Sequence, residues 1–421
     1  MLNYLRNLIV LVALALLVMI LMPVGSSVDF GEWRAVVVHS DDWGLEGWFP
    51  TGISDSLRAR LSADVPEWQS AYLQSTLESA GEVRELTEWF STITDLDGLP
   101  LVLQANTIMA GPSVRELASG ETWPVHASGS GPDYFRPGLD EAVDDAIASG
   151  VWWPELHGLT HYDLARYAEA RRAGDELAVA AAEEGTFAYD GYRQEAELDR
   201  ADPEYARAVV FEAVERFESR FGRRPRSVIA ADYRWGDEDE RAWAEAGLHI
   251  VQAKREQVDR SIAPHTKFGR LEKWLRRYWF DRTSALRRIE RTVDLEPYGD
   301  ARPDAAQGAI AAHRALEHAM TRRDIAVLSI HRVQLVSTDP AIASAGRAQL
   351  AEVVRLLQDS GGVRFLVDDE VDQLRRQGWS VLQRGPALVL RNWTDEARTI
   401  VGPDGTGHHV QARSSAVLRN L

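Results

Sequence analysis

The sequence predicts an α/β fold made of parallel β-α-β units, and three observations lead to this prediction. Short apolar runs alternate with longer amphipathic stretches over most of the chain, which is typical of parallel units rather than of a β-sandwich. Four of the apolar runs end directly in polar clusters, as strands do where functional side chains gather at the carboxyl ends of a parallel sheet. The 421 residues suit one large core on the scale of an α/β barrel, with a small appendage.

Seven apolar runs are the predicted strands. They are expected at residues 35–38, 101–105, 152–156, 227–231, 248–252, 325–330 and 363–367. Between them, a helix that starts near residue 139 is expected to end at Gly150, because glycine suits a helix C-cap. Asp202 followed by Pro203 predicts the start of a helix that runs to Phe221. Apolar residues on one face predict a further helix over residues 347–359.

The last part of the chain has a different pattern. From about Trp379 the helical periodicity is lost, and short strand-like runs are broken by Gly-Pro and Pro-Asp-Gly turns. We therefore expect a small β appendage over residues 377–421, after an α/β core over residues 29–376.

Residues 1–28 are expected to form a membrane-targeting segment. Arg6 precedes an apolar run over residues 8–22, and the next charge is Asp29. A spanning helix needs about 20 mostly apolar residues, and a signal peptide has a shorter apolar centre. We favour an uncleaved transmembrane helix; the alternative is a cleaved signal and a secreted protein. Either way, the charge bias predicts that the rest of the chain lies on the extracytoplasmic side, in the cell envelope or periplasm.

Composition excludes several classes of function. The formal net charge of -17 and the sequence pI near 5.2 argue against a nucleic-acid partner, because phosphate binding needs clustered Lys and Arg. The chain has no cysteine, which excludes disulfides, a thiol nucleophile and Cys-ligated zinc. Any metal site must therefore use histidine and carboxylate ligands.

Two pairs of residues at predicted strand ends suggest such a site. His157 and His161 lie in HGLTH, and two imidazoles four residues apart can bind one ion if the chain turns helically between them. Asp41 and Asp42 lie in HSDDWG, where adjacent carboxylates are costly unless a cation or a catalytic task compensates. Each pair alone has an ordinary explanation, a chance spacing or a solvated turn. Together, Asp42, His157 and His161 supply three ligands and leave a position open for water, as catalytic zinc sites do.

These motifs resemble those of the polysaccharide deacetylases of the NodB-homology type, in the glycoside hydrolase/deacetylase superfamily. HSDDWG is similar to the Asp-Asp motif that follows the first strand of that family. HGLTH matches both histidines of H-[ST]-x-x-H, with Gly158 where the family has Ser or Thr. LSIH, which ends at His331, matches the Leu-x-x-His motif at the end of a late strand. The motifs occur in the family's order, and the resemblance covers about Arg34 to Leu374.

The resemblance implies a fold and a mechanism. The fold would be a distorted (β/α) barrel of the deacetylase type. One divalent metal ion, most simply zinc, with cobalt, manganese and nickel as alternatives, would bind to Asp42, His157 and His161. Asp41 would act as the catalytic base, and His331 would protonate the leaving group.

Further residues follow from the resemblance with less support from the motifs. DYRWG at residues 232–236 stands in place of Arg-Pro-Pro-Tyr-Gly, so Arg234 is the candidate to steady the catalytic aspartate and contact substrate. Trp43 and Trp235 are further candidates for substrate binding, because aromatic faces suit sugar rings. Asn106 is another candidate, because it stands at the end of the predicted strand over residues 101–105. The family's fourth motif, an aspartate that tunes the catalytic histidine, has two candidate counterparts, at residues 294 and 296.

The implied function is the metal-dependent removal of N- or O-acetyl groups from a cell-envelope or exported polysaccharide. Two alternatives remain open at this point. The same superfamily fold also serves glycoside hydrolases, so a glycosidic bond could be the one that is cleaved. The third hypothesis is a non-catalytic, membrane-anchored glycan-binding protein.

Overall fold

A computed structural model describes residues 28–50, 52–63, 65, 67–114, 125–131, 134–187, 196–199, 202–254, 258–259, 286–296 and 305–419, together with Ala13. Nearly all of the segment for which a membrane helix is predicted lies outside these residues. Among the helices that the structure does describe, none combines the length and the apolar character needed to cross a bilayer.

The centre of the fold is a parallel sheet in the order β10-β8-β6-β5-β2-β1-β12-β11, with β13 paired to the start of β1. Every pairing in this sheet is parallel. The strands are β1 (Ala35–Trp43), β2 (Leu103–Thr107), β5 (Trp152–Leu156), β6 (Ser227–Val228), β8 (Ile250–Ala253), β10 (Arg287–Glu290), β11 (Val293–Asp294), β12 (Ala326–His331) and β13 (Arg364–Leu366). The predicted α/β class is therefore confirmed.

The two edges of this sheet belong to one short segment of the chain. Only Arg291 and Thr292 separate β10 from β11, yet these strands stand at opposite ends of the order. The Arg291 N–H donates to Ala253 of β8, and the Thr292 N–H donates to Val327 of β12. The sheet is therefore a curled half-barrel, and the segment 287–294 bridges its two edges.

Side chains of β1 alternate between two apolar cores, because successive residues of a strand point to opposite faces. Val36 and Val38 pack in the larger core with helices outside the sheet. Val37 packs inside the curl with Ile250 and Ile289. Burial on both faces explains why the strands are continuous apolar runs rather than alternating ones.

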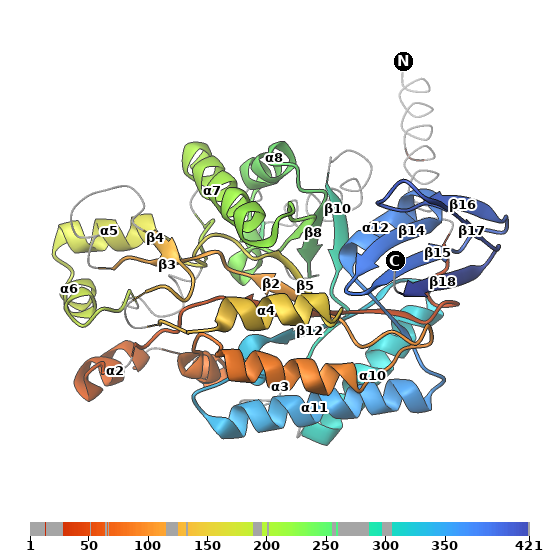
Figure 1. The fold of residues 1–421 in the computed structure, drawn as a ribbon. Helices are drawn as coiled ribbons and strands as arrows, with labels where there is room; N and C mark the ends of the chain where they lie inside the picture. Colours follow the sequence, from red (N-terminus) through yellow and green to blue (C-terminus); the bar gives the residue numbers. More distant parts are fainter. Residues whose placement is uncertain are drawn as a thin grey trace, which may run out of the picture.

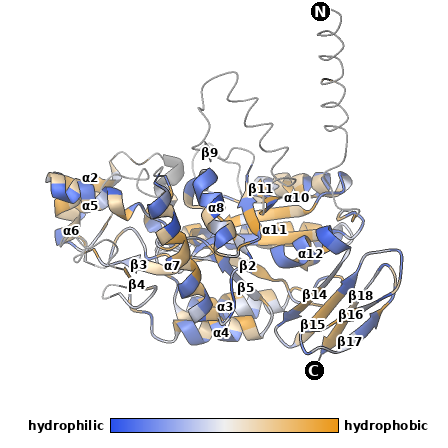
Figure 2. Ribbon diagram, turned by 90° about the horizontal axis from the view of Figure 1, so that it is seen from above, coloured by the Kyte–Doolittle hydropathy of each residue, from blue (hydrophilic) through white to orange (hydrophobic). Residues whose placement is uncertain are grey.

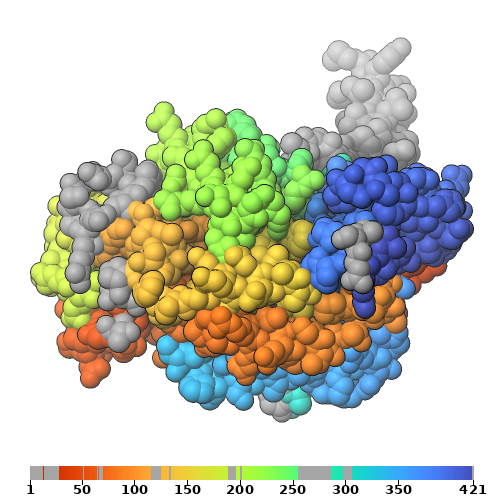
Figure 3. Space-filling view, viewed as in Figure 1, coloured from red at the N-terminus to blue at the C-terminus, as the bar shows by residue number. Residues whose placement is uncertain are grey.

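Helices cover the outside of the sheet (Figure 1). They include α3 (Ala80–Ser91), α4 (Leu139–Ala148), α7 (Pro203–Phe221), α8 (Asp237–Glu245), α10 (Ala305–Thr321) and α11 (Pro340–Asp359). Helix α12 (Asp368–Gln377) instead contributes Val371 and Leu374 to the core inside the curl. On the face seen in Figure 3, α4 lies between α7 and α3. The short helices α8 and α12 are largely hydrophilic (Figure 2).

One helix start differs from the prediction. Helix α11 begins at Pro340, capped by the side chain of Asp339, and not near residue 347. The Asp-Pro signal is the same as at α7, where Asp202 is the cap and Pro203 is the first residue. The apolar face begins later along the helix than the cap does, and the prediction followed the apolar face.

A smaller α-helical group lies at one side of the sheet (Figure 1). It consists of α2 (Asp55–Ser62), α5 (Leu164–Ala173) and α6 (Glu176–Glu183). Helix α5 begins directly after the HGLTH segment, with Asp163 as its N-cap.

The chain ends in five strands, in the region where short strands were predicted. They are β14 (Trp379–Arg384), β15 (Ala387–Asn392), β16 (Arg398–Val401), β17 (Gly407–Val410) and β18 (Ser414–Arg419). Buried Arg391 of β15 pairs with Glu370 of α12 and with Asp97. Trp393 stacks on Trp33, with ring centroids 4.7 Å apart. The appendage is thus packed against the α/β core through charged and aromatic contacts.

Candidate metal centre and active site

The two adjacent aspartates stand at an irregularity of β1. The pairing of β1 with β2 shifts register between Ser40 and Trp43, and Asp42 has a φ of 71°. In a regular strand, consecutive side chains point to opposite faces, whereas a bulge re-aims them. Both carboxylates accordingly act electrostatically on the same imidazole, that of His157.

The segment from His157 to His161 is a loop, and not the helical turn that the spacing suggested. Gly158 has a φ of 86°, and His161 has a φ of 73°. Left-handed backbone at a residue other than glycine is uncommon and concentrates at functional sites. Through this loop, His157 and His161 meet with their ring centroids 5.0 Å apart.

Asp42, His157 and His161 form the candidate metal centre. One donor atom from each lies within 4.8 Å of the others, and all three residues are buried. Asp42 Oδ1 lies 3.2 Å from His157 Nε2 and 3.5 Å from His161 Nε2. These distances leave the three donors grouped around one point, which a divalent cation could share.

The partners of the two imidazoles favour a cation there. His157 Nδ1 lies 3.0 Å from the carbonyl oxygen of Ile229, a contact that puts the proton of the neutral imidazole on Nδ1 and would leave the Nε2 lone pair for an ion. In the part of the chain that the structure describes, the buried Nδ1 of His161 has no hydrogen-bond partner. That nitrogen is not the one that faces Asp42, so the fit to a metal ion rests on the two Nε2 atoms grouped at Asp42 Oδ1.

The pKa values of the two histidines move in opposite directions. Burial works against protonation of His157, but the hydrogen bond to Asp42 and the two carboxylate charges outweigh it and raise its pKa. Burial lowers the pKa of His161 to about 4, with the charges of His157 and His331 acting in the same direction. Burial would raise the pKa of Asp42, but the three histidines lower it instead. At neutral pH, Asp42 is therefore an anion beside a neutral His161.

Asp41 is held by a clamp of buried polar groups. Arg291 donates to both of its carboxylate oxygens at 2.6 Å, and Asn106 Nδ2 donates to Oδ1 at 2.7 Å. Gln252 bonds both Arg291 and Asn106. Burial would raise the pKa of Asp41, but Arg291 outweighs burial and holds the pKa well below its usual range.

Among the residues that the structure describes, these bonds leave one acceptor position open on Asp41. A carboxylate offers about four lone-pair sites, two on each oxygen. Oδ1 accepts from Asn106 and Arg291, whereas Oδ2 accepts from Arg291. His331 Nε2 lies 3.7 Å from Oδ2. The free position on Oδ2 is thus on the carboxylate oxygen that lies near His331.

His331 stands beside Asp41 because of strand pairing. The two residues are direct partners in the parallel register of β1 and β12. His331 Nδ1 lies 3.4 Å from Glu296 Oε1, and the Tyr72 ring meets the imidazole edge to face at 5.3 Å. Of the two candidates for the tuning carboxylate, Glu296 is therefore the one that the structure places against His331.

Arg234 does not lie where the resemblance implied. Its guanidinium pairs with Asp232 at 2.7 Å and with Asp199 at 3.3 Å, and not with Asp41. The arginine that holds Asp41 is Arg291, which follows β10. The DYRWG segment still reaches the clamp through Tyr233, whose hydroxyl accepts from Arg291 at 2.6 Å.

The three other predicted substrate contacts are buried. Trp235 is 1% exposed and packs on Trp243. Trp43 is also 1% exposed, contacts Trp152 edge to face, and lines a cavity of about 360 Å³ next to α4 and α7. Asn106 is fully buried in the Asp41 clamp. Neither tryptophan presents an open ring face to a sugar at the metal centre, because both rings complete the packing around the sheet.

The residues missed from the sequence share a signal. Gln252 and Ser329 are polar residues inside apolar strands, and both bond Arg291 within the curl. A polar side chain in a fully buried strand must find polar partners there, so such residues point to a polar interior. Arg291 itself carries no local signal, because its place depends on how the sheet curls.

No family model and no curated protein matches the chain. Solved structures do match over most of its length. One is a protein from Mycobacterium smegmatis assigned to the polysaccharide deacetylases, with 13% identity, covering 84% of this chain and 94% of that chain, at a TM-score of 0.43. Another is a family 4 acetyl xylan esterase from Clostridium thermocellum in complex with a cobalt ion, with 9% identity, coverages of 81% and 91%, and a TM-score of 0.37.

A third match is a CE4 family pseudoenzyme from Bacillus anthracis, with 9% identity, covering 78% of this chain and 62% of that chain, at a TM-score of 0.34. At these identities and TM-scores, the fold is better judged from the sheet topology, and the chemistry from the side chains. By these comparisons, the chain is similar, at low identity, to polysaccharide deacetylases and family 4 carbohydrate esterases.

Proposed function

We propose that the protein is a metal-dependent hydrolase that removes acetyl groups from a polysaccharide. One observation carries the proposal: a buried Asp-His-His donor set lies directly beside an aspartate and a histidine, Asp41 and His331, that are 3.7 Å apart. This arrangement combines a place for a Lewis acid with one proton acceptor and one proton donor, which hydrolysis of an acyl group requires.

Asp42, His157 and His161 would hold the ion, most simply zinc, for which three protein ligands are typical of catalytic sites. Bound there, a divalent ion would polarise the acetyl carbonyl and lower the pKa of a water molecule. His157 is oriented for this role by the Ile229 carbonyl at its Nδ1, because such a contact fixes the tautomer of a ligand.

Asp41 would accept the proton of the attacking water at Oδ2. Its other acceptor positions are taken by Arg291 and Asn106, so the carboxylate can turn in neither direction. Arg291 keeps Asp41 ionised, since its charge holds the pKa of that carboxyl well below the usual range. The clamp therefore makes Asp41 a weaker base but fixes the direction of its carboxylate.

His331 would donate a proton from Nε2 to the departing amine or alkoxide. Glu296 faces its Nδ1 at 3.4 Å and would help to orient the ring. Acid and base stand on neighbouring strands in direct register, so their separation is set by the sheet. A well-placed acid or base contributes about 100 to 10,000-fold in rate.

The polysaccharide substrate and the extracytoplasmic setting follow from the sequence motifs and the apolar segment over residues 8–22. An exported or cell-envelope polysaccharide is the substrate that this setting supplies. We also propose that residues 1–28 anchor the protein to the membrane.

The test uses the purified full-length protein. Bound metal is measured by elemental analysis, and acetate release is followed from acetylated xylan and from N-acetylated chitin oligosaccharides, before and after chelation. Asp42→Ala is measured beside the wild type. We expect one metal ion per chain, its loss in Asp42→Ala, and acetate release that falls with it.

Other outcomes separate the alternatives. Bound metal without acetate, but with new reducing ends, would mean that a glycosidic bond is cleaved. A chain that binds no metal under any condition would favour the glycan-binding protein.

A further inference from the structure

One carboxylate holds the loop between the two candidate histidine ligands. Glu197 Oε2 accepts from the Leu159 N–H at 2.9 Å, and Oε1 accepts from the Thr160 N–H at 2.6 Å. The Thr160 hydroxyl donates to Oε1 at 3.0 Å. Successive backbone N–H groups that converge on one anion form a nest, and hydrogen bonds to a charged acceptor are about twice as strong as neutral ones.

The shape of the loop matches this carboxylate. Left-handed residues, Gly158 and His161, flank the two amides. A β-carbon on residue 158 would lie 2.3 Å from Glu197 Oε2, far inside van der Waals contact. Only glycine fits at this position while Glu197 occupies its place.

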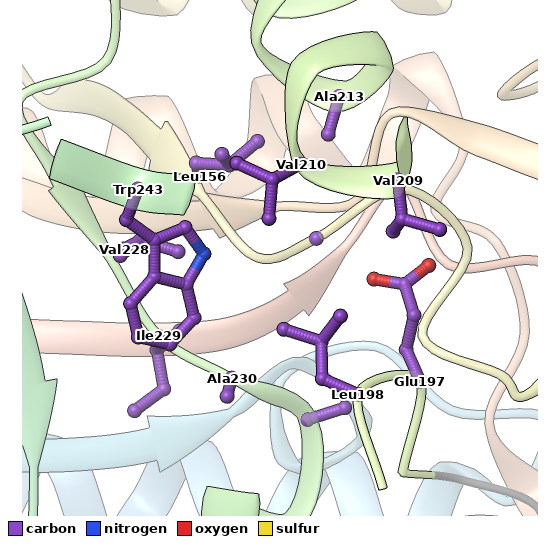
Figure 4. Close-up of a pocket in the computed structure, with 12 residues that line it drawn as sticks. Leu156, Glu197, Leu198, Val209, Val210, Ala213, Val228, Ile229, Ala230 and Trp243 are labelled. Atoms are coloured by element: carbon purple, nitrogen blue, oxygen red, sulfur yellow. The ribbon is translucent and has the colours of Figure 1, made fainter. Parts of the chain in front are cut away.

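Apart from the loop, the described residues around the adjacent pocket are almost entirely apolar. Glu197 is 2% exposed, and the other side chains that line the adjacent pocket, Val209 and Leu198 among them, are apolar apart from the Trp243 indole nitrogen (Figure 4). Burying a carboxylate among apolar groups is costly unless it is fully hydrogen-bonded. The three donors of the loop are what makes the burial of Glu197 tolerable, so the loop and the carboxylate depend on each other.

We propose that Glu197 is the positioning residue of the metal centre. By holding the amides of Leu159 and Thr160, it sets the separation and direction of His157 and His161 for one divalent cation. The inference rests on the proposed metal site and adds a residue 37 positions beyond Thr160 that does not touch the ion. Without the carboxylate, the two amides would lose their shared acceptor and the loop would relax away from the left-handed conformation at Gly158.

Glu197→Gln tests the proposal in the full-length protein. The side-chain amide keeps the volume but offers one acceptor oxygen where two amides need acceptors. The readouts are Zn²⁺ affinity by competition with a chromophoric chelator and the visible absorption of bound Co²⁺, which reports ligand geometry. We expect about a 10 to 100-fold loss of Zn²⁺ affinity, as for other groups that orient metal ligands, and an altered Co²⁺ spectrum.

Glu155→Gln is the matched control. Glu155 is likewise buried and hydrogen-bonded at both oxygens: Oε2 accepts from the consecutive amides of Arg226 and Ser227 at 2.7 and 2.8 Å, and Oε1 accepts from Trp153 Nε1 and Arg223 at 3.0 and 3.2 Å. Burial raises the pKa of both glutamates. Its substitution should lower the thermal stability comparably but leave Zn²⁺ affinity and the Co²⁺ spectrum of the folded protein unchanged.

Two further variants keep the test decisive. Glu197→Asp retains the charge with a shorter reach and should lose less affinity than Glu197→Gln; it carries the test if the glutamine variant does not fold. Gly158→Ala would place a β-carbon against Glu197, so it should lower Zn²⁺ affinity and alter the Co²⁺ spectrum as Glu197→Gln does. If the wild type binds Zn²⁺ and all folded variants bind it equally with the same Co²⁺ spectrum, Glu197 has no positioning role. If the wild type binds neither ion, the proposed metal site itself is wrong, and this inference falls with it.

Discussion

The guanidinium of Arg291 donates to both carboxylate oxygens of Asp41 at 2.6 Å, although the two residues are 250 positions apart in the chain. The contact exists because the segment 287–294 bridges the two edges of the curled sheet and brings its central residue into the interior. It replaces the contact that the resemblance had implied for Arg234.

Arg291→Lys should therefore impair catalysis without removing the metal. Lysine keeps the charge but lacks the planar fork that matches a carboxylate, so Asp41 would gain rotational freedom. A small misplacement of a catalytic group costs about 100-fold in rate, and we expect a loss of that order in kcat/KM for acetate release. Metal content should stay at the wild-type value.

Arg234→Lys is the control for this prediction. Its partners are Asp199 and Asp232, not Asp41, and its side chain is 29% exposed. The rate should stay within about twofold of the wild type, since partly exposed pairs contribute little. A large loss in Arg234→Lys and none in Arg291→Lys would restore the original assignment.

His331→Gln should separate substrates by their leaving groups. If His331 protonates the departing group, its loss should lower acetate release from a polysaccharide by about 100 to 10,000-fold. Nitrophenyl acetate should lose far less activity, because its phenolate leaves without a proton. Steady-state rates on both substrates check this, and an equal loss on both would assign His331 to another task.

The proximity of the candidate ligands was predictable because it depends on short sequence motifs at the ends of predicted strands. Asp42 lies near the end of β1, His157 follows β5, and the carboxyl ends of parallel strands meet at one edge of a sheet. The burial of Trp235 was not predictable, because aromatic residues beside a site serve packing as readily as binding. Nor was the loop conformation of HGLTH, since the hydrogen bonds that shape it come from Glu197, far along the chain.

Metal affinity should weaken as the pH falls. The logarithm of the affinity should change by about one per pH unit, the slope for one displaced proton rather than two. A histidine ligand must be unprotonated to bind. The pKa of His157 is raised by Asp42 and the neighbouring carboxylates against the effect of burial, so its proton competes with the metal from near neutral pH downward. Burial lowers the pKa of His161 to about 4, so this residue competes only in more acidic solution.

Zn²⁺ titrations between about pH 5 and pH 6.5, the unperturbed histidine pKa, would measure that slope. Nearly one proton should be released per ion bound. A slope near two would mean that both imidazoles are protonated in the metal-free protein. Asp42→Asn provides a check without metal: it removes the carboxylate that raises the pKa of His157, so the His157 signal in NMR spectra of the metal-free variant should titrate at lower pH than in the metal-free wild type.

Asp368 should support stability above about pH 4 and lose that role in acid. The residue is fully buried, with His39 Nε2 at 2.8 Å from one carboxylate oxygen and Gln104 donating to the other at 2.7 Å. Burial would raise its pKa, but His39 and the hydrogen bonds lower it. Because the folded-state pKa lies below the unfolded value of about 3.9, ionised Asp368 stabilises the fold above that pH. This stabilisation is lost as the pH falls through the folded-state pKa.

Asp368→Asn should accordingly cost about 1 to 3 kcal/mol at pH 7, as expected for a buried hydrogen-bonded group that loses its partner, and less at pH 3. Urea unfolding at both pH values measures the difference. Asp369→Asn is the neighbouring control, since its ion pair with Arg226 is long at 3.5 Å and a change of about 0.5 kcal/mol or less is expected. A cost for Asp368→Asn that does not change with pH would mean that packing, and not the charge, is what Asp368 contributes.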